Sequence, residues 1–171
     1  MGYKFTTMDP DIDEKSIRNK DPKKLVLDLA YAKASALLPK IKKPAILITA
    51  DQVVYCNDII IEKPKDKKEA EKFLHLYIKH PAKTISAIVT TNTSTKKQAH
   101  GIDIATIWFH PIPKDVIKQL INQECVLNCA GGFTLDDPIL QKYILKIKGT
   151  EESITGLPVE LTERLIGKVL T

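Results

Sequence analysis

Residues 45–64 read AILITADQVVYCNDIIIEKP, and this stretch decides the fold because it predicts a β-hairpin. Ala45–Ile48 is an apolar run long enough for a buried strand, and Val53–Tyr55 and Ile59–Ile61 are rich in β-branched residues. Asn57-Asp58, between the last two runs, is a turn-prone pair. We therefore expect two strands that pair in antiparallel fashion across this turn.

The expected hairpin also brings charge to one of its ends. With Asn57 and Asp58 as the loop, Gln52 lies opposite Lys63, so Asp51 and Lys63 are expected at the same end. A carboxylate beside a fixed cation suits the binding of a metal or a water next to an anionic group. A solvated salt bridge at the end of a strand is the alternative, and spacing alone does not separate the two interpretations.

Composition predicts one soluble globular domain. The chain has 171 residues, of which 43% are hydrophobic and 27% are charged, which are ordinary values for a domain with one core. No apolar run approaches the roughly 18 residues of a membrane span, and Met1–Pro10 lacks the apolar centre of a signal peptide. Three cysteines, an odd number, indicate free thiols. We therefore expect a cytoplasmic protein without a membrane partner.

The net charge of +5 permits binding to polyanions, both nucleotides and nucleic acids. The lysines are dispersed, however, and aromatic residues do not alternate with them as they do on a surface that binds single-stranded nucleic acid. A solvated, lysine-rich surface explains most of them more simply. Nucleic acid is therefore not expected as a partner.

The rest of the chain alternates between helix and strand signals. Asp21-Pro22 is typical of an N-cap followed by proline at the first helical position, and it opens a helix that runs to about Leu38. Asp66, with Glu69 three residues later, predicts a capping box for a helix that runs to about Lys79. Further strands are expected at Tyr3–Thr7, Thr84–Thr91, Ile102–Phe109 and Tyr143–Ile147, and further helices at about Lys114–Asn122, at Asp137-Pro138 and at Val159–Leu170.

Four separated segments carry residues suited to phosphate chemistry. Carboxylates are concentrated in Asp11-Ile12-Asp13-Glu14, Lys33 follows on the first expected helix, Asp51 and Lys63 bracket the hairpin, and Gly131-Gly132 precedes Asp136. Brought together around a cleft, such groups suit triphosphate chemistry, in which a divalent metal and lysines offset phosphate charge and a carboxylate orients water. Separate, salt-bridged surfaces are the alternative.

The motifs in these segments resemble those of a known family. They are Asp11-Ile12-Asp13-Glu14, Ala32-Lys33-Ala34, Ala50-Asp51-Gln52-Val53-Val54, Lys63-Pro64 with Glu69-Ala70, Cys129-Ala130-Gly131-Gly132-Phe133 and Gly156-Leu157-Pro158. In this order, and spread over nearly the whole chain, they resemble the Maf family of nucleoside triphosphate pyrophosphatases, also called septum formation inhibitor Maf-like proteins. The resemblance implies a single Maf-like domain over residues 1–171 and favours a catalytic interpretation of Asp51 and Lys63 over a surface salt bridge.

The resemblance implies a fold and a reaction. The fold is α/β, elongated and two-lobed, with a mixed central sheet and a nucleotide cleft, similar to the inosine triphosphate pyrophosphatases. The reaction is hydrolysis of a nucleoside triphosphate between its α- and β-phosphates, which gives a monophosphate and pyrophosphate with help from Mg²⁺ or Mn²⁺. The family resemblance also implies a homodimer.

Roles for individual residues follow from the matched motifs. Asp51 occupies the acidic position of the Ala-Asp-x-Val-Val motif, so the resemblance implies that it is the catalytic base or water-orienting acid and a metal ligand. Glu14, the last acid of the Asp-x-Asp-Glu motif, matches a metal ligand. Lys33 and Lys63 match lysines that contact phosphate, where they stabilise charge and position the substrate.

Asp136 bears on the choice of substrate. It lies where one branch of the family has glutamine and another, resembling 7-methyl-GTP pyrophosphatases, has an acid. A carboxylate accepts hydrogen bonds from N1–H and the amino group of guanine, whereas a pyrimidine carbonyl needs a donor. The sequence therefore favours 7-methyl-GTP-like substrates over dTTP and UTP. A helix cap before Pro138 is an alternative role for Asp136.

One departure from the family leaves the activity open. Maf proteins are expected to begin with an apolar strand and a serine-rich turn that ends in arginine and binds phosphate, and this segment does not precede Met1-Gly2-Tyr3-Lys4-Phe5. The chain thus resembles an amino-terminally truncated member. Three hypotheses remain: an active pyrophosphatase, a catalytically weakened or inactive nucleotide-binding relative, and a basic nucleic-acid-binding module that rests on charge alone.

Overall fold

The computed structural model describes residues 2–171, apart from the side chains of Glu124 and Cys125. The chain divides into two compact units. The first unit comprises Met1–Asp51, Ser86–Asp103 and Leu157–Thr171, and the second comprises Gln52–Ile85 and Ile104–Gly156. Within the described residues, no helix is both long and apolar enough to cross a lipid bilayer.

Five strands form one sheet in the order β2-β1-β3-β4-β5. Its neighbouring strands run antiparallel, which corrects the expectation of a mixed sheet while the α/β class is confirmed. The reason is local: short turns join β1 to β2 and β3 to β4, and a tight turn returns the chain antiparallel. Hydrogen bonds between Ala45 and Thr93 likewise place the start of β1 beside the end of β3. The strands are β1 (Ile46–Cys56), β2 (Ile59–Ile61), β3 (Ala82–Asn92), β4 (Gln98–Phe109) and β5 (Ile144–Lys148).

The predicted hairpin is present, with one difference. Val54 pairs with Ile61 and Cys56 with Ile59, the register expected when Asn57-Asp58 is the turn. Both turn residues have positive φ, 48° and 61°, as a two-residue hairpin turn of this kind requires. The difference is that β1 continues without a break from Ile46 to Cys56, so the polar residues at its centre interrupt the hydrophobic pattern but not the strand.

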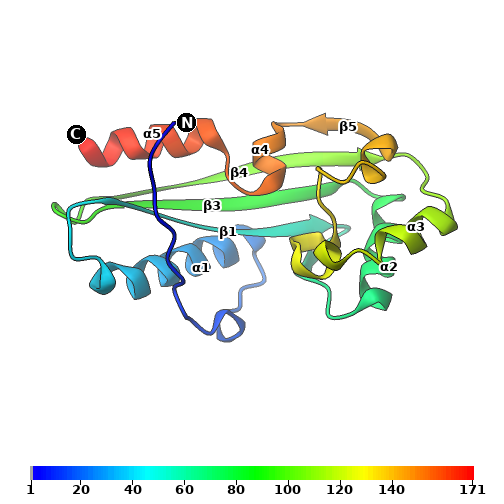
Figure 1. Cartoon of the computed structure of the whole chain (residues 1–171), viewed down its shortest axis with the longest axis horizontal. Coiled ribbons are helices and arrows are strands. Elements are labelled where there is room, and N and C mark those ends of the chain that lie inside the picture. Colours follow the sequence, from blue (N-terminus) through cyan, green and yellow to red (C-terminus); the bar gives the residue numbers. More distant parts are fainter. Residues whose placement is uncertain (1) are drawn as a thin grey trace. The chain divides into compact units, whose positions relative to one another are not determined.

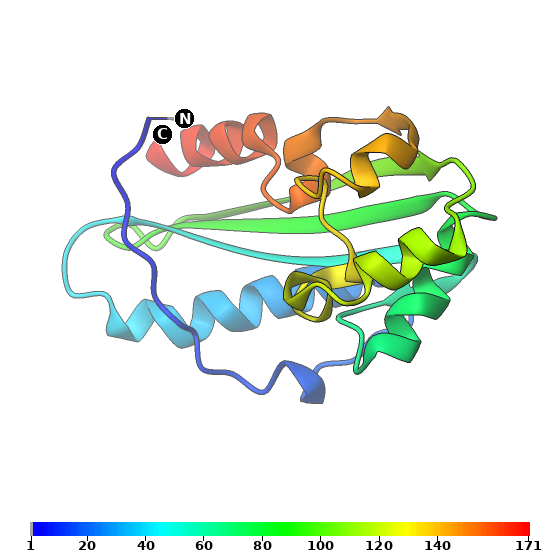
Figure 2. The same cartoon turned by 45° about the vertical axis from the view of Figure 1, so that its right-hand side comes forward.

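In the first unit, helices α1 (Pro22–Leu37) and α5 (Val159–Leu170) lie on opposite sides of the strands (Figures 1 and 2). The Thr49 hydroxyl of β1 donates to the Ala30 carbonyl of α1 at 2.8 Å. On the α5 side, the Thr90 hydroxyl of β3 donates to the Leu165 carbonyl at 3.2 Å. The predicted start of α1 is confirmed, because the Asp21 side chain accepts from the backbone N–H of Lys23 with proline at the first helical position.

The second unit holds helices α2 (Lys67–Tyr77), α3 (Lys114–Leu120) and α4 (Glu151–Thr155). Its core contains Tyr77, Phe109 and Phe133, whose ring centroids lie 5.5–6.1 Å apart. The predicted cap of α2 is confirmed, since Asp66 accepts from the backbone N–H of Glu69 at 2.8 Å. Five short 3-10 helices complete the helical segments of the described chain: Glu14–Ser16, Leu38–Lys40, Glu124–Asn128, Ala130–Gly132 and Leu140–Tyr143.

Two further segments of the described chain differ from expectation. The predicted strand at Tyr3–Thr7 is wrong: this segment is extended coil, and the Phe5 side chain is 82% exposed. Alternating residues do not form a strand unless a neighbouring strand pairs with them. Helix α4 was not predicted, because five residues are too few to show a helical period, although Thr150 caps it by accepting from the Ser153 N–H.

Cys56 and Cys129 are thiols and not disulfide partners, as the odd cysteine count predicts, and the side chain of Cys125 lies outside the described residues. Cys56 is buried in the core of the second unit. Burial raises the pKa of its thiol to about 11, so the neutral form persists well above physiological pH. Cys56 therefore has a packing role and is a poor nucleophile.

Gly131 is held at a crowded turn in the second unit, and we expect Gly131→Ala to destabilise it. Its N–H donates to the Glu62 carbonyl at 3.0 Å, and its carbonyl accepts from the Tyr77 hydroxyl at 2.9 Å. Its φ is +78°, and an added Cβ would lie 2.5 Å from Val54 Cγ2. Positive φ and overpacking together predict a loss of about 2–4 kcal/mol in the free energy of unfolding, measured by urea titration.

Gly167→Ala provides the matched control for this prediction. Gly167 lies in α5, and no atom within 4 Å opposes a Cβ there. Alanine should stabilise an exposed helical position by roughly 0.5–1 kcal/mol. Equal unfolding midpoints for Gly131→Ala and the wild-type protein would contradict the steric argument.

Candidate active site

Three predicted residues meet in the first unit. Lys33 Nζ lies 2.6 Å from Asp51 Oδ1 and 2.9 Å from Glu14 Oε1. The Lys33 and Asp51 side chains are 16% and 11% exposed, whereas that of Glu14 is 51% exposed. We call these three residues the acid–lysine cluster. It presents one cation between two carboxylates at the edge of solvent.

Local packing explains how the acid–lysine cluster forms. Thr49 and Asp51 are two residues apart on β1, so their side chains share one face of the strand. Thr49 bonds to the carbonyl of Ala30 on α1, and Lys33 lies three residues further along that helix, on the same side. The side chain of Lys33 therefore reaches Asp51.

Glu14 enters the cluster from the segment before α1. It opens the 3-10 helix Glu14–Ser16, and the Asp13 side chain caps this turn by accepting from the Lys15 N–H at 3.1 Å. The acids of the Asp11-Ile12-Asp13-Glu14 motif thus have different tasks. Asp13 fixes the turn, and Glu14 reaches the lysine.

The electrostatics of the cluster keep Lys33 charged. Burial alone would lower the pKa of its ammonium group, but hydrogen bonds to Asp51 and then to Glu14 more than offset burial, so the pKa is raised above its ordinary value. A charged ammonium at this position holds the Asp51 carboxylate in place and offers positive charge to an anionic ligand.

A divalent cation such as Mg²⁺ needs several oxygen ligands in one place. Among the described residues, no group of three or more His, Cys, Asp or Glu side chains is arranged to hold a metal ion. The cluster does supply two carboxylates, Glu14 and Asp51, on either side of Lys33 Nζ. Mg²⁺ is commonly bound by one or two carboxylates together with substrate phosphates, so this pair fits a metal that arrives with a phosphate substrate.

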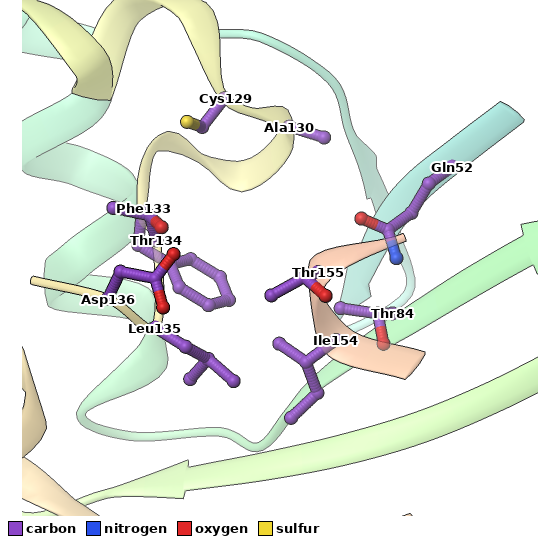
Figure 3. A pocket seen from close by; sticks show the side chains of 10 residues that line it. All are labelled: Gln52, Thr84, Cys129, Ala130, Phe133, Thr134, Leu135, Asp136, Ile154 and Thr155. Atoms are coloured by element: carbon purple, nitrogen blue, oxygen red, sulfur yellow. The ribbon is translucent and has the colours of Figure 1, made fainter. Parts of the chain in front are cut away.

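The second unit contains a pocket of about 280 Å³. Figure 3 shows Phe133 and the Asp136 carboxylate on one side of it, with Gln52, Thr84 and Thr155 on the other. The remaining lining residues are Cys129, Ala130, Thr134, Leu135 and Ile154. An aromatic ring beside a carboxylate suits a flat, polar ligand such as a nucleobase.

The alternative role of Asp136 as a helix cap is not observed. Its neighbour Asp137 is buried and accepts from the backbone N–H groups of Ile139 at 2.7 Å and Leu140 at 3.1 Å. The predicted helix at this point is the 3-10 helix Leu140–Tyr143. Asp137, and not Asp136, is the acid whose side chain binds the backbone at the start of this helix. Asp136 is left with its carboxylate exposed at the pocket.

Three polar side chains of the pocket donate to carbonyls of α4. Gln52 Nε2 donates to the Ser153 carbonyl at 3.0 Å, and the Thr84 hydroxyl donates to the same carbonyl at 3.3 Å. The Thr155 hydroxyl donates to the Glu152 carbonyl at 3.2 Å. These bonds occupy one N–H of Gln52 and the hydroxyl protons of Thr84 and Thr155, which would otherwise be offered to a ligand.

The five predicted site residues are thus divided between the two units. Glu14, Lys33 and Asp51 meet in the first unit; Asp136 lines the pocket of the second, and Lys63 is exposed in the loop between β2 and α2 of that unit. Sequence reasoning missed Gln52, Thr84 and Thr155 as pocket residues. Of these three residues, only Gln52 could have been suggested from the sequence, because it follows Asp51 directly in the Ala-Asp-x-Val-Val motif.

Comparisons with known proteins identify the family. The family model described as Maf-like protein matches residues 1–169. A 7-methyl-GTP pyrophosphatase of Dictyostelium discoideum is 44% identical over 99% of this chain and 88% of its own length. A dTTP/UTP pyrophosphatase of Vibrio parahaemolyticus is 27% identical over 99% of this chain and 88% of its own. With the acid–lysine cluster formed by the family motifs, these matches show that the chain belongs to the Maf-like protein family.

Proposed function

We propose that this protein is a nucleoside triphosphate pyrophosphatase that hydrolyses the bond between the α- and β-phosphates and releases a monophosphate and pyrophosphate. The observation that carries the proposal is the acid–lysine cluster, in which Lys33 Nζ bridges Asp51 and Glu14 at 2.6 and 2.9 Å. The relatives named as pyrophosphatases of 7-methyl-GTP and of dTTP and UTP support the same class of reaction.

In this proposal Asp51 is the catalytic residue. Its carboxylate accepts a hydrogen bond from the attacking water and takes up a proton as the water attacks phosphorus. Lys33 holds the carboxylate in position and contributes positive charge to the phosphate chain. The low exposure of both side chains strengthens these interactions relative to the same groups in bulk water.

Glu14 and Asp51 are the residues that would hold Mg²⁺ or Mn²⁺. When bound, the metal supplies a Lewis acid that polarises phosphate oxygens and offsets their charge. The two carboxylates provide oxygen ligands, which these hard cations prefer, and the phosphates of the substrate complete the set.

Two further residues are assigned to substrate binding. Lys63 contacts phosphate, in keeping with its position in the Lys63-Pro64 motif and its exposure to solvent. Asp136 binds the base, which favours 7-methyl-GTP over dTTP and UTP. Support comes from its place in the pocket and from the 44% identity to the 7-methyl-GTP pyrophosphatase. We also propose a cytoplasmic location and a homodimeric assembly.

Pyrophosphate release tests the proposed activity. The purified chain is incubated with 7-methyl-GTP, GTP, dTTP, UTP and inosine triphosphate, each with Mg²⁺ and with Mn²⁺, and with a chelator as control. We expect release of pyrophosphate and no inorganic phosphate, with 7-methyl-GTP giving the largest kcat/KM. Nucleotide binding without hydrolysis would instead identify a non-catalytic relative, and salt-sensitive binding to DNA or RNA with no nucleotide affinity would favour a nucleic-acid-binding module.

A further inference from the structure

The pocket of the second unit has an unusual charge balance for a protein with a net charge of +5. None of its ten lining residues is lysine, arginine or histidine, and Asp136 is the one carboxylate among them. Cys129 is the other titratable side chain in the lining. A ligand that enters the pocket therefore meets a negative charge without a matching positive one.

The hydrogen-bonding capacity of the pocket has the same bias. Gln52, Thr84 and Thr155 donate to the carbonyls of Ser153 and Glu152 on α4. The Thr134 hydroxyl, also in the lining, can either donate or accept, so it favours neither kind of ligand edge. Asp136, in contrast, is acceptor-only when ionised, and no ion pair or hydrogen bond holds its carboxylate within the described chain. The pocket therefore favours a ligand edge that supplies donors over one that supplies carbonyl oxygens.

Among the nucleobases, guanine fits this bias. Its N1–H and its amino group are adjacent donors that one carboxylate accepts together, whereas uracil and thymine place carbonyls on both sides of a single N–H. Methylation at N7 adds a delocalised positive charge to the same ring. The methylated base thus offers both the donors and the cation that the pocket lacks.

N7-methylation also makes the N1 proton acidic, so that it dissociates near neutral pH. Loss of this proton removes one of the two donors and cancels the positive charge of the ring. Both features that Asp136 recognises disappear in a single titration of the ligand. Unmethylated guanine, which keeps N1–H to more alkaline pH, does not change in the same range.

We propose that the pocket selects the N1-protonated, cationic form of N7-methylguanine through Asp136. Affinity for methylated guanine nucleotides then falls as pH rises through neutrality, while affinity for unmethylated ones does not. The inference rests on the proposed function for the identity of the ligand, and it adds the protonation state that is bound and the origin of the preference for the methyl group.

Calorimetry with the reaction products tests the proposal without requiring catalysis. The probes are 7-methyl-GMP and GMP, titrated into the wild-type protein at about pH 6 and about pH 8.5 to bracket the ligand's titration. Because deprotonation removes one charge-assisted hydrogen bond to Asp136, we expect 7-methyl-GMP to bind roughly tenfold or more tightly at the lower pH. GMP carries the same monophosphate, whose charge also changes over this range, so the ratio of the two affinities isolates the ring and should itself fall roughly tenfold between the two pH values.

Asp136→Asn and Asp115→Asn form the matched pair of variants. Asparagine keeps the shape of the side chain but replaces an acceptor with a donor, so Asp136→Asn should lose both the preference for the methylated base and its pH dependence. Asp115, an exposed acid in the first turn of α3 and outside the pocket, should leave both unchanged when replaced. Thermal unfolding checks that each variant is folded.

The outcomes separate this inference from the proposed function. A pH-independent affinity of the wild-type protein for 7-methyl-GMP would overturn the inference, whatever the variants do. A fall shared equally by GMP would also overturn it, because the titrating group would then be one that both ligands meet or carry, and not the methylated ring. If pH-dependent binding is intact but no pyrophosphate is released, the pyrophosphatase proposal is contradicted and the inference about the selected protonation state is supported.

Discussion

Asp51→Asn is expected to lower kcat for pyrophosphate release by at least about 100-fold, because an amide cannot take up the proton that a general base removes. The variant should remain folded, since Lys33 retains its 2.9 Å contact with Glu14 and asparagine keeps the shape of the lost side chain. The measurement is pyrophosphate release from the best triphosphate substrate at saturating concentration. Circular dichroism and thermal unfolding establish that the fold is intact.

Asp28→Asn is a suitable control for this variant. Asp28 is an exposed acid on α1, the helix that carries Lys33, and its Oδ2 accepts from Asn19 at 3.3 Å. Removing its charge alters the net charge of the protein by the same amount and should change kcat by less than a factor of about two, as expected for a surface substitution. Turnover by Asp51→Asn within threefold of wild type would remove Asp51 from its catalytic role.

Lys33→Met should damage both catalysis and stability. It takes away the cation between Asp51 and Glu14 and the positive charge offered to phosphate, while keeping a long apolar side chain of similar helix propensity. Two charge-assisted hydrogen bonds are lost, so we expect kcat/KM to fall by about 100-fold or more and the free energy of unfolding to fall by roughly 1–3 kcal/mol. Steady-state kinetics and urea titration measure the two effects.

The pH dependence of this stability loss has a definite sign. The pKa of Lys33 is raised in the folded protein from 10.5, so its pairing stabilises the folded state fully below that value. The contribution disappears as pH rises through the folded-state pKa. The difference in unfolding free energy between wild type and Lys33→Met should therefore be constant from pH 7 to about pH 10 and shrink above it.

Lys24→Met controls for the loss of a lysine from the same helix. Lys24 is exposed near the start of α1, outside the acid–lysine cluster. Its replacement should leave kcat/KM within a factor of about two of the wild-type value. Equal losses in the two variants would mean that the effect comes from net charge and not from the cluster.

Features with a local cause could be predicted from the sequence. Asp21-Pro22 sets the start of α1 through one side-chain bond and one fixed dihedral, and Asn57-Asp58 sets the hairpin turn through positive φ. α5 has the predicted bounds, Val159–Leu170, and begins directly after the Gly156-Leu157-Pro158 entry. Each depends on residues within a few positions of one another, which is the range that sequence patterns describe.

Features that depend on distant contacts could not be predicted in this way. β1 runs through Asp51 and Gln52 because neighbouring strands pair with it, although the hydrophobic pattern stops there. Nothing in the spacing places Lys33 Nζ between Glu14 and Asp51; the family motifs marked all three residues, and the packing of α1 on β1 supplies the distances. The hydrogen bonds from Gln52 and Thr84 to α4 were likewise out of reach, because the helix itself was not predicted.

The Ser153 carbonyl of α4 accepts hydrogen bonds from both Gln52 and Thr84. The donors that the pocket offers to a ligand therefore depend on whether this five-residue helix is folded. So short a helix has little stability of its own and depends on its cap and its contacts. If α4 unwinds locally, it returns an amide and a hydroxyl donor to the pocket, which could then bind the carbonyls of pyrimidines. Substitutions that loosen α4 should therefore broaden the range of substrates before they reduce turnover, and relatives with different base preferences can arise without any change to the residues that touch phosphate.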